Sequence, residues 1–362
     1  METINFKELF EKNCYEVSVG DLLLQTGEVL REKSNLVMEM FVEPLQGFFN
    51  LLLDYQKRKL DEPVRQVCIS FLRSAMYLGN PVLLVEAYTN TPFLVKPVMS
   101  CELNAAWMFP CWEKYQEKME ERIRQQALGR YVREPERKSY DSKAVSAVLG
   151  YLVIYLKYMV RQLEQYPEWK ELEQTKDFTI SYGEYMDWQL TLNQIRDEID
   201  PFLCSEKEDM HFRKFEKQCY EEKTFPDWIM DDSIFRECTF RKVTFRGTRF
   251  RMTRFFDCIF EDCHFQEVEM GGSSILSSRV KNTGFENCRL LDGFYRQGKA
   301  KVLYPPVVFR WSLLESVHWE ETPIEEKCFV DCQIFDETER ENEIFQDTSG
   351  SADIQSDRTE RH

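Results

Sequence analysis

The chain has 362 residues, of which 43% are hydrophobic and 30% are charged, and this composition is ordinary for a soluble globular protein long enough for two domains. It contains 47 Lys or Arg and 63 Asp or Glu, so its formal net charge is −16. An acidic chain repels nucleic acid at long range, which disfavours direct binding of DNA or RNA.

Targeting and membrane segments are not predicted. The first residues contain scattered acids and no apolar core, unlike a secretory signal. The longest apolar stretch, residues 145–160, is interrupted by Lys157 and is short for a bilayer, so a buried helix is predicted there. The 12 Cys lack the spacing of a disulfide framework or a zinc site, which favours a reducing cytoplasm.

Residues 1–200 are predicted to form an all-α domain. Apolar residues recur at three- and four-residue spacings, and they predict helices over 35–60, 62–78, 102–128, 140–173 and 187–199. Residues 81–99, with three prolines, are left unassigned. Residues 201–230 are charged and then aromatic, and we expect a linker that caps the next domain.

A period of five residues replaces the helical spacing from about residue 231. Large apolar residues occupy every fifth position, as unit centres: Phe235, Phe240, Phe245, Phe250, Phe255, Phe260, Phe265, Met270, Ile275, Val280, Phe285 and Leu290. Small or β-branched residues stand two positions before each centre: Ser233, Cys238, Val243, Thr248, Thr253, Cys258, Cys263, Val268, Ser273, Ser278, Thr283 and Cys288. Because extended backbone alternates its side chains, both sets are predicted to point inward.

This pattern resembles the pentapeptide-repeat family over roughly residues 233–334. The resemblance implies an α+β multidomain chain, in which the all-α domain is followed by a right-handed quadrilateral β-helix, the pentapeptide-repeat solenoid. Four units make one coil of 20 residues in that family, so residues 20 apart should be neighbours. The family also implies a bacterial source.

The repeats are predicted to be interrupted once. After a first run over 231–295, residues 296–306 contain Pro305 and Pro306 and should form a loop on one face. A weaker second run over 307–335 has the centres Phe309, Leu314, Trp319, Ile324, Phe329 and Ile334, with Lys327 departing from the small-residue rule. Residues 336–362 are predicted to be an acidic, disordered tail.

Arginines give the candidate protein-binding site of the solenoid. Arg236, Arg241, Arg246 and Arg251 each follow a centre, and we expect one on each face, as a basic collar at the end of the solenoid. The 20-residue coil places Arg241 beside Glu261 and Arg236 beside Phe256. The alternative is that these arginines are ordinary solvated residues of the ladder.

Catalytic, cofactor and metal sites are not predicted. The sequence has no nucleophile elbow, no phosphate-binding loop and no zinc-protease motif, and it has only 4 His. Cys258, Cys263 and His264 resemble a metal cluster in sequence, but their register puts both cysteines inside and His264 outside. Cys238 and Cys258, one coil apart, are expected to be a reduced pair in the core.

The leading hypothesis is therefore a non-catalytic cytoplasmic scaffold protein that binds another protein, with no membrane and no direct nucleic-acid contact. A first alternative follows from the resemblance, because some pentapeptide-repeat proteins mimic DNA and bind DNA gyrase or topoisomerase. Residues 231–290 contain ten Lys or Arg and nine Asp or Glu, which is too neutral to favour it. A second alternative makes the N-terminal domain an unrecognised enzyme or effector that the solenoid positions. The sequence predicts no oligomeric state.

Overall fold

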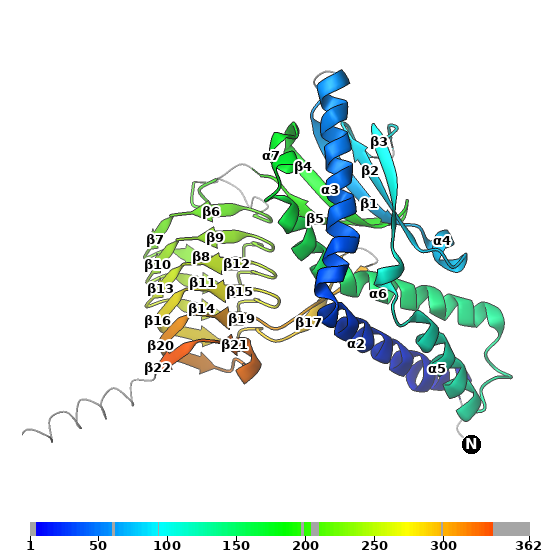
Figure 1. Cartoon of the computed structure of the whole chain (residues 1–362). Helices are drawn as coiled ribbons and strands as arrows, with labels where there is room; N and C mark the ends of the chain where they lie inside the picture. The colour runs from blue at the N-terminus through cyan, green and yellow to red at the C-terminus, as the bar shows by residue number, and fades with distance from the viewer. Residues whose placement is uncertain are drawn as a thin grey trace, which may run out of the picture. The chain divides into compact units, whose positions relative to one another are not determined.

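A computed structural model describes residues 5–59, 62–92, 94–196, 199–203, 210–297 and 300–335 (Figure 1). The chain divides into two compact units. Unit 1 comprises Met1–Arg196 and Phe294–Tyr304, and unit 2 comprises Asp197–Gly293 and Pro305–His362. The predicted acidic tail lies outside the described residues.

Unit 1 contains long helices in three of the predicted segments, 35–60, 102–128 and 140–173, and α3 and α6 are the longest. Their apolar faces pack into one core that includes Phe41, Leu45 and Leu149. By length and composition α3 and α6 could also cross a membrane, and each buries one face in this core. The α-helices are α1 Phe6–Phe10, α2 Val17–Glu32, α3 Ser34–Lys59, α4 Arg73–Tyr77, α5 Trp112–Gln125, α6 Glu134–Leu163 and α7 Pro167–Glu171, with a π-helical turn at Glu11–Glu16 and a 3₁₀ turn at Ala106–Met108.

A five-stranded sheet in unit 1 shows that the prediction of an all-α domain was wrong. The order is β3-β2-β1-β4-β5, with β1 and β4 parallel and the other neighbours antiparallel. Val67, Ile69 and Phe71 of β1 point into the core with the two-residue spacing of a strand, within a segment that was predicted as a helix. The strands are β1 Val64–Phe71, β2 Val82–Tyr88, β3 Met99–Asn104, β4 Gln174–Glu184 and β5 Trp188–Gln194, the last within a predicted helix.

The insertion between the two repeat runs is a β-hairpin rather than a surface loop. Its strands are β17 Gly293–Gln297 and β18 Ala300–Tyr304, and it belongs to unit 1. Ala300 and Val302 are buried in the core of that unit. Gly150 lies where β18 crosses α6, since a Cβ there would overlap the carbonyl oxygen of Lys301. Two residues of the insertion therefore complete the unit 1 core.

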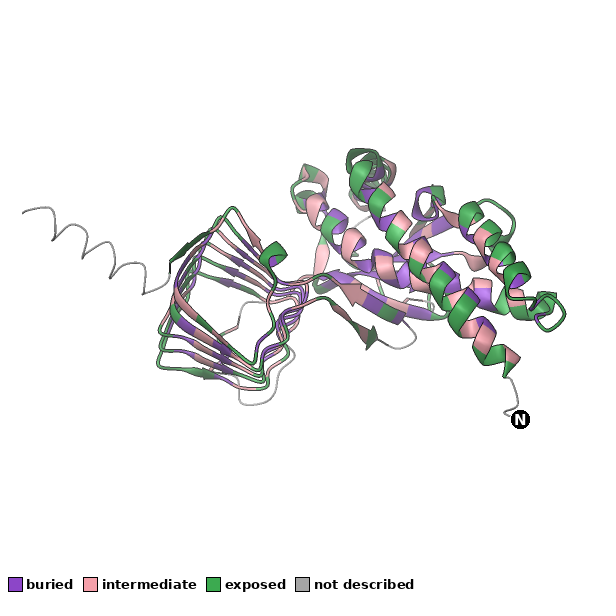
Figure 2. Cartoon of the chain, turned by 90° about the horizontal axis from the view of Figure 1, so that it is seen from below, coloured by how far each residue is buried: buried purple, intermediate pink, exposed green. Residues whose placement is uncertain are grey.

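Unit 2 consists of coils in which residues 20 apart pair in parallel, across four columns (Figures 1 and 2). Column 1 contains β6 Lys214–Glu216, β9 Ile234–Arg236, β12 Arg254–Phe256, β15 Ser274–Leu276, β19 Val308–Arg310 and β21 Phe329–Val330. Columns 2 and 3 share the longer strands β16 Arg279–Glu286 and β20 Leu313–Glu320. The short strands of column 2 are β7 Cys219–Glu221, β10 Thr239–Arg241, β13 Ile259–Glu261 and β22 Gln333–Phe335. The short strands of column 3 are β8 Thr224–Phe225, β11 Thr244–Arg246 and β14 His264–Gln266. Column 4 has isolated bridges only, through Ile229, Arg249, Glu269 and Arg289.

Stacked aromatic rings fill the interior of the coils. Phe240 lies between Tyr220 and Phe260, with ring centroids 5.3 and 4.8 Å away. All twelve centres of the first run are buried, and so are the twelve small residues that precede them. Several of the small residues also donate to the carbonyl of a centre in the preceding coil, as Thr253 Oγ1 does to Met230 at 2.7 Å. These bonds explain why Ser, Thr and Cys suit this inward position.

The corners of each coil are formed by residues whose backbone is in the left-handed region. Two positions after a centre, φ is +54° at Glu237, +49° at Lys242 and +53° at Asp257. Polar residues, Asn and Asp above all, tolerate this conformation better than β-branched ones. The corner therefore recurs every five residues without requiring glycine.

The repeats begin one coil earlier than the sequence predicted. Residues 210–230, expected to be linker, form a complete coil with the buried centres Phe215, Tyr220, Phe225 and Met230. Phe202 packs its ring against Tyr220, Phe225 and Trp228, with centroids 5.0 to 5.7 Å apart, and so covers apolar residues of this first coil.

The second run continues the columns after the hairpin. Phe309 pairs with Ile275, and Phe329 pairs with Phe309. Lys327 is exposed, while Cys328 is buried in the core instead. A one-residue shift through the 3₁₀ turn Glu326–Cys328 thus accommodates the lysine that broke the pattern.

Candidate functional site

Two of the four predicted arginines have the neighbours that the coil length gave them. Arg236 lies over the ring of Phe256, with 5.2 Å from its guanidinium carbon to the ring centroid. Arg241 donates from Nε to Glu261 Oε2 at 3.2 Å. Both contacts are confirmed, because residues 20 apart are adjacent rungs of one column.

Of the other two arginines, one is exposed and one is buried, so the four do not form a basic collar. Arg246 is exposed in column 3. Arg251 is only 7% exposed, against our expectation, and its Nε lies 3.4 Å from Asp231 Oδ2 and 3.8 Å from Glu269 Oε2. The strand that carries Arg236 also lies between two others, β6 and β12, so these arginines are not at the end of the solenoid.

Asp231 organises the charges around Arg251. Its carboxylate accepts from the Arg251 backbone N at 3.0 Å and from Arg249 Nε at 2.9 Å. Burial raises the pKa of Asp231 to about 6, although Arg251 and Arg249 oppose this shift. Two arginines and a carboxylate are thereby held together, which indicates a structural role for Arg251 rather than a binding role.

Column 1 presents a strip of outward-facing side chains, which we call the column 1 strip. Its exposed members are Arg236, Arg310 and Trp311, and its half-buried members are Phe256 and Leu276. Arg236, Phe256, Leu276 and Arg310 follow the buried centres of successive coils, and they pair in that order. Trp311 is 60% exposed, and the Arg310 guanidinium carbon lies 5.4 Å from the centroid of its ring. Among the described residues, neither Arg236 nor Arg310 forms an ion pair. The strip therefore offers unneutralised guanidinium groups on both sides of an apolar centre.

Column 4 carries a shallow polar concavity with a volume of ≈ 800 Å³. This hollow lies where the column has single bridges instead of strands, and Gly247, with φ of +64°, leaves a side chain out of it. Its lining alternates in charge: Asp227, Ile229, Gly247, Arg249, Glu267, Glu269, Asn287 and Arg289.

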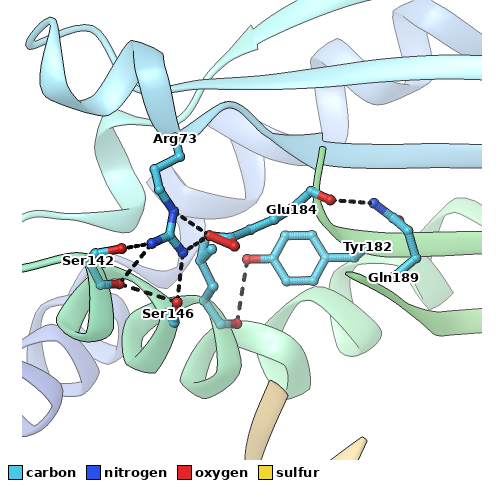
Figure 3. Close-up of polar contacts among 7 residues, drawn as sticks. Arg73, Ser142, Ser146, Tyr182, Glu184 and Gln189 are labelled. Atoms are coloured by element: carbon cyan, nitrogen blue, oxygen red, sulfur yellow. Dashed lines mark hydrogen bonds and ion pairs between the residues drawn. The ribbon is translucent and has the colours of Figure 1, made fainter. Parts of the chain in front are cut away.

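Unit 1 has a polar cluster at the carboxyl ends of its two parallel strands (Figure 3). Arg73, just after β1, donates to Glu184 at the end of β4 and to Ser142 and Ser146 of α6. Ligands of open α/β sheets often bind at such an edge. Here, however, Glu184 is buried, and it pairs with Arg73. The cluster joins α6 to the sheet, which is a structural role.

A second set of polar groups lies on neighbouring strands of the same sheet. Tyr88 donates to Glu86 at 3.1 Å, and Gln66 donates to Ser181 at 3.0 Å. Burial raises the pKa of Glu86, and it raises the pKa of the adjacent Cys68 thiol to about 11. A thiol with such a high pKa is a weak nucleophile at neutral pH.

A cleft of ≈ 280 Å³ lies between α1, α5 and the first turns of α6. Burial raises the pKa of Asp141, one of its lining residues, and Asp141 accepts from Tyr115 at 3.4 Å. Arg137 and Lys138 also line the cleft, and they pair with Glu120 and Glu134 at 3.6 and 2.9 Å. Asp141 is the carboxyl of the described lining whose pKa is raised, whereas the hydrogen bond from Lys138 lowers the pKa of Glu134.

The register-based prediction for the cysteines holds in the geometry. Cys258 and Cys263 are buried, and their thiols donate to backbone carbonyls of the preceding coil at 3.5 and 3.3 Å. The neighbouring Cys238 thiol and burial raise the pKa of Cys258 above its usual range. His264 lies outside, with Nε2 3.0 Å from Glu286 Oε2. No cluster of three or more metal-binding side chains occurs in the part of the chain that the structure describes.

Comparison with known proteins adds little to this geometry. The sequence matches no protein-family model and no curated protein. Solved structures similar to this chain include QnrB1, described as a plasmid-mediated fluoroquinolone resistance protein. A trypsin-treated variant of it is 11% identical with a TM-score of 0.25, over 41% of this chain and 95% of its own. A second such variant is 12% identical with a TM-score of 0.14, and the match covers 39% of this chain and 100% of the variant. The full-length protein is 10% identical with a TM-score of 0.12, and the match covers 38% of this chain and 99% of that protein. Values this low carry no argument about function.

Proposed function

We propose that this chain is a non-catalytic scaffold protein, and that its solenoid binds another protein through the column 1 strip. The observation that carries the proposal is the exposure of Trp311, Arg310 and Arg236 on a ladder of fixed register, with no ion pair to either arginine among the described residues. Exposed aromatic residues and arginines are enriched where proteins bind one another. The stacked interior keeps the strip in place at little entropic cost on binding.

The strip favours a partner whose surface is acidic and contains an apolar side chain. Guanidinium groups in the column attract carboxylates, and Phe256 and Leu276 between them supply apolar area that is lost from water on binding. We further propose that the coils wind as the right-handed quadrilateral of the pentapeptide-repeat family, and that the protein acts in a bacterial cytoplasm.

Affinity capture from the native lysate tests this function, with a variant and a matched control. The variant Arg236→Glu, Arg310→Glu reverses both charges of the strip, whereas the control Arg241→Glu changes an arginine of column 2 that Glu261 already neutralises. We expect a partner that the native protein and the control retain and the strip variant loses. A partner retained equally by all three proteins contradicts the proposal.

DNA mimicry with binding to a topoisomerase is the first alternative. Charge argues against it, because the sign changes from coil to coil instead of staying negative. Residues 230–249 contain five Lys or Arg and three Asp or Glu, whereas residues 250–269 contain two and five. Neighbouring rungs neutralise each other, as Arg241 and Glu261 do. A gyrase supercoiling assay that shows inhibition by the native chain would restore this alternative.

An unrecognised enzyme or effector in unit 1 is the second alternative. The cleft beside Asp141 is the feature that favours it, because a partly buried carboxyl with a raised pKa is typical of general acids and bases. Its other described charges are already paired, which favours a structural role. Thermal-shift screening with candidate small molecules, carried out on the native chain and on Asp141→Asn, distinguishes an active site from a structural role. A ligand of an active site here raises the melting temperature of the native chain but not that of the variant.

A further inference from the structure

We propose that the acidic tail of this same chain occupies the column 1 strip, and that a partner must displace it. The first half of this proposal concerns intramolecular docking and stands without any partner. The second half, regulation of binding, rests on the proposed function. Three observations on the charges, the reach and the apolar residues support the docking.

Charge complementarity is the first observation. The strip carries Arg236 and Arg310, both exposed, and neither forms an ion pair with the described residues. Residues 336–362 contain nine Asp or Glu and three Lys or Arg. Five of these acids fall within eight residues: Asp336, Glu337, Glu339, Glu341 and Glu343. The strongest local excess of acid in the tail is therefore also the part nearest its attachment.

The place where the described chain ends is the second observation. Phe335 ends β22, which pairs with β20 in column 2, the column that follows column 1 along each coil. Arg310 and Arg236 lie three rungs apart, which is about 14 Å at the usual strand spacing. Ten extended residues reach roughly 33 Å, so residues 336–345 can span the strip. A tether this short also gives a millimolar effective concentration, so that weak contacts suffice for docking.

Matching apolar residues are the third observation. The acidic run is followed at once by Ile344 and Phe345. The strip has Phe256 and Leu276 between its two arginines, and Trp311 beside Arg310. An acidic run that lies along the arginines keeps Ile344 and Phe345 within a few residues of these apolar side chains.

Trypsin cleavage of the intact protein tests the docking, because Arg340 lies inside the proposed docked segment and Arg358 lies beyond it. The initial cleavage rate after each arginine is measured by mass spectrometry and divided by the rate for the same bond in a synthetic peptide of residues 336–362. This ratio removes the intrinsic effect of the acids beside Arg340. We expect cleavage after Arg340 to be about fivefold slower in the protein than in the peptide, with Arg358 little protected.

Two variants and one control locate the docked segment. Protection of Arg340 should be lost in the double variant with both Arg236→Glu and Arg310→Glu, and it should be retained in the control Arg241→Glu. The tail variant Glu341→Gln, Glu343→Gln, measured against its own peptide, should also lose it, and this variant leaves the solenoid unchanged. Cleavage after Arg340 at the peptide rate in the native protein overturns the proposal, and so does protection that persists in the strip variant. Since no partner is present, these results do not depend on the proposed function.

Discussion

Replacing Gly150 by Ala should destabilise unit 1, although the same change usually stabilises a helix. Gly150 lies in the interior of α6, where Ala is favoured by about 1 kcal/mol. A Cβ at this position would overlap the Lys301 carbonyl oxygen and lie 3.1 Å from the carbonyl carbon, and neither atom belongs to a flexible side chain. The hairpin must therefore move away from α6.

The cost of that movement follows from what the hairpin buries. Val302 is fully buried and Ala300 nearly so, and exposing a valine costs about 1.5–3 kcal/mol. The loss exceeds the gain in helix propensity, so we expect a net destabilisation of about 1–2 kcal/mol.

Urea unfolding of the whole chain, followed by the circular dichroism of its helices, measures this difference. The matched control is Gly47→Ala in the interior of α3, where nothing lies within 4 Å of the added Cβ, so it should stabilise unit 1 by about 0.5–1 kcal/mol. If Gly150→Ala stabilises as much as Gly47→Ala, the hairpin does not pack on α6 as described.

Three further predictions concern the solenoid core, the polar cluster and pH. Phe240→Ala, which removes a ring stacked on both sides, should lower the unfolding free energy of unit 2 by about 3–5 kcal/mol in urea unfolding followed by hydrogen exchange of the solenoid amides, and a loss below about 1 kcal/mol contradicts the stacked core. Arg73→Met and Glu184→Gln should each cost unit 1 about 2 kcal/mol, and a double-mutant cycle in which the two losses add fully is evidence against their pairing. Since burial raises the pKa of Asp231 to about 6, the folded state holds this proton more tightly than the unfolded state, and stability falls as the pH rises from about 4 to about 6. Asp231→Asn should flatten that slope in melting temperatures measured across this range, and an unchanged slope refutes the raised pKa.

The solenoid was largely predictable, because a period of five fixes which residues meet. The contacts of Arg241 with Glu261 and of Arg236 with Phe256 follow from the coil length alone. The first coil was missed because Arg213, Gln218, Lys223 and Trp228 occupy its small-residue positions. Gln218 and Lys223 are exposed in the structure, so a small residue is not required in this coil. The burial of Arg251 depends on its surroundings, which no periodicity reveals.

Unit 1 was less predictable, because a buried strand and a buried helix can show the same apolar spacing. Val64, Val67 and Phe71 are three and four residues apart, as on one face of a helix, yet they belong to β1. The hairpin was missed for a different reason. Its packing against α6 joins residues 150 and 301, and such a distant pairing leaves no local pattern in the sequence.

The most direct test of the central claim is a calorimetric titration of a captured partner into three proteins. They are the native chain, the double variant with both Arg236→Glu and Arg310→Glu, and the control Arg241→Glu. If the column 1 strip binds the partner, the strip variant should lose at least about tenfold in affinity, as expected for reversed charges at an interface, and the control should change less than about twofold. Equal affinity for all three proteins would show that the solenoid strip is not where the partner binds.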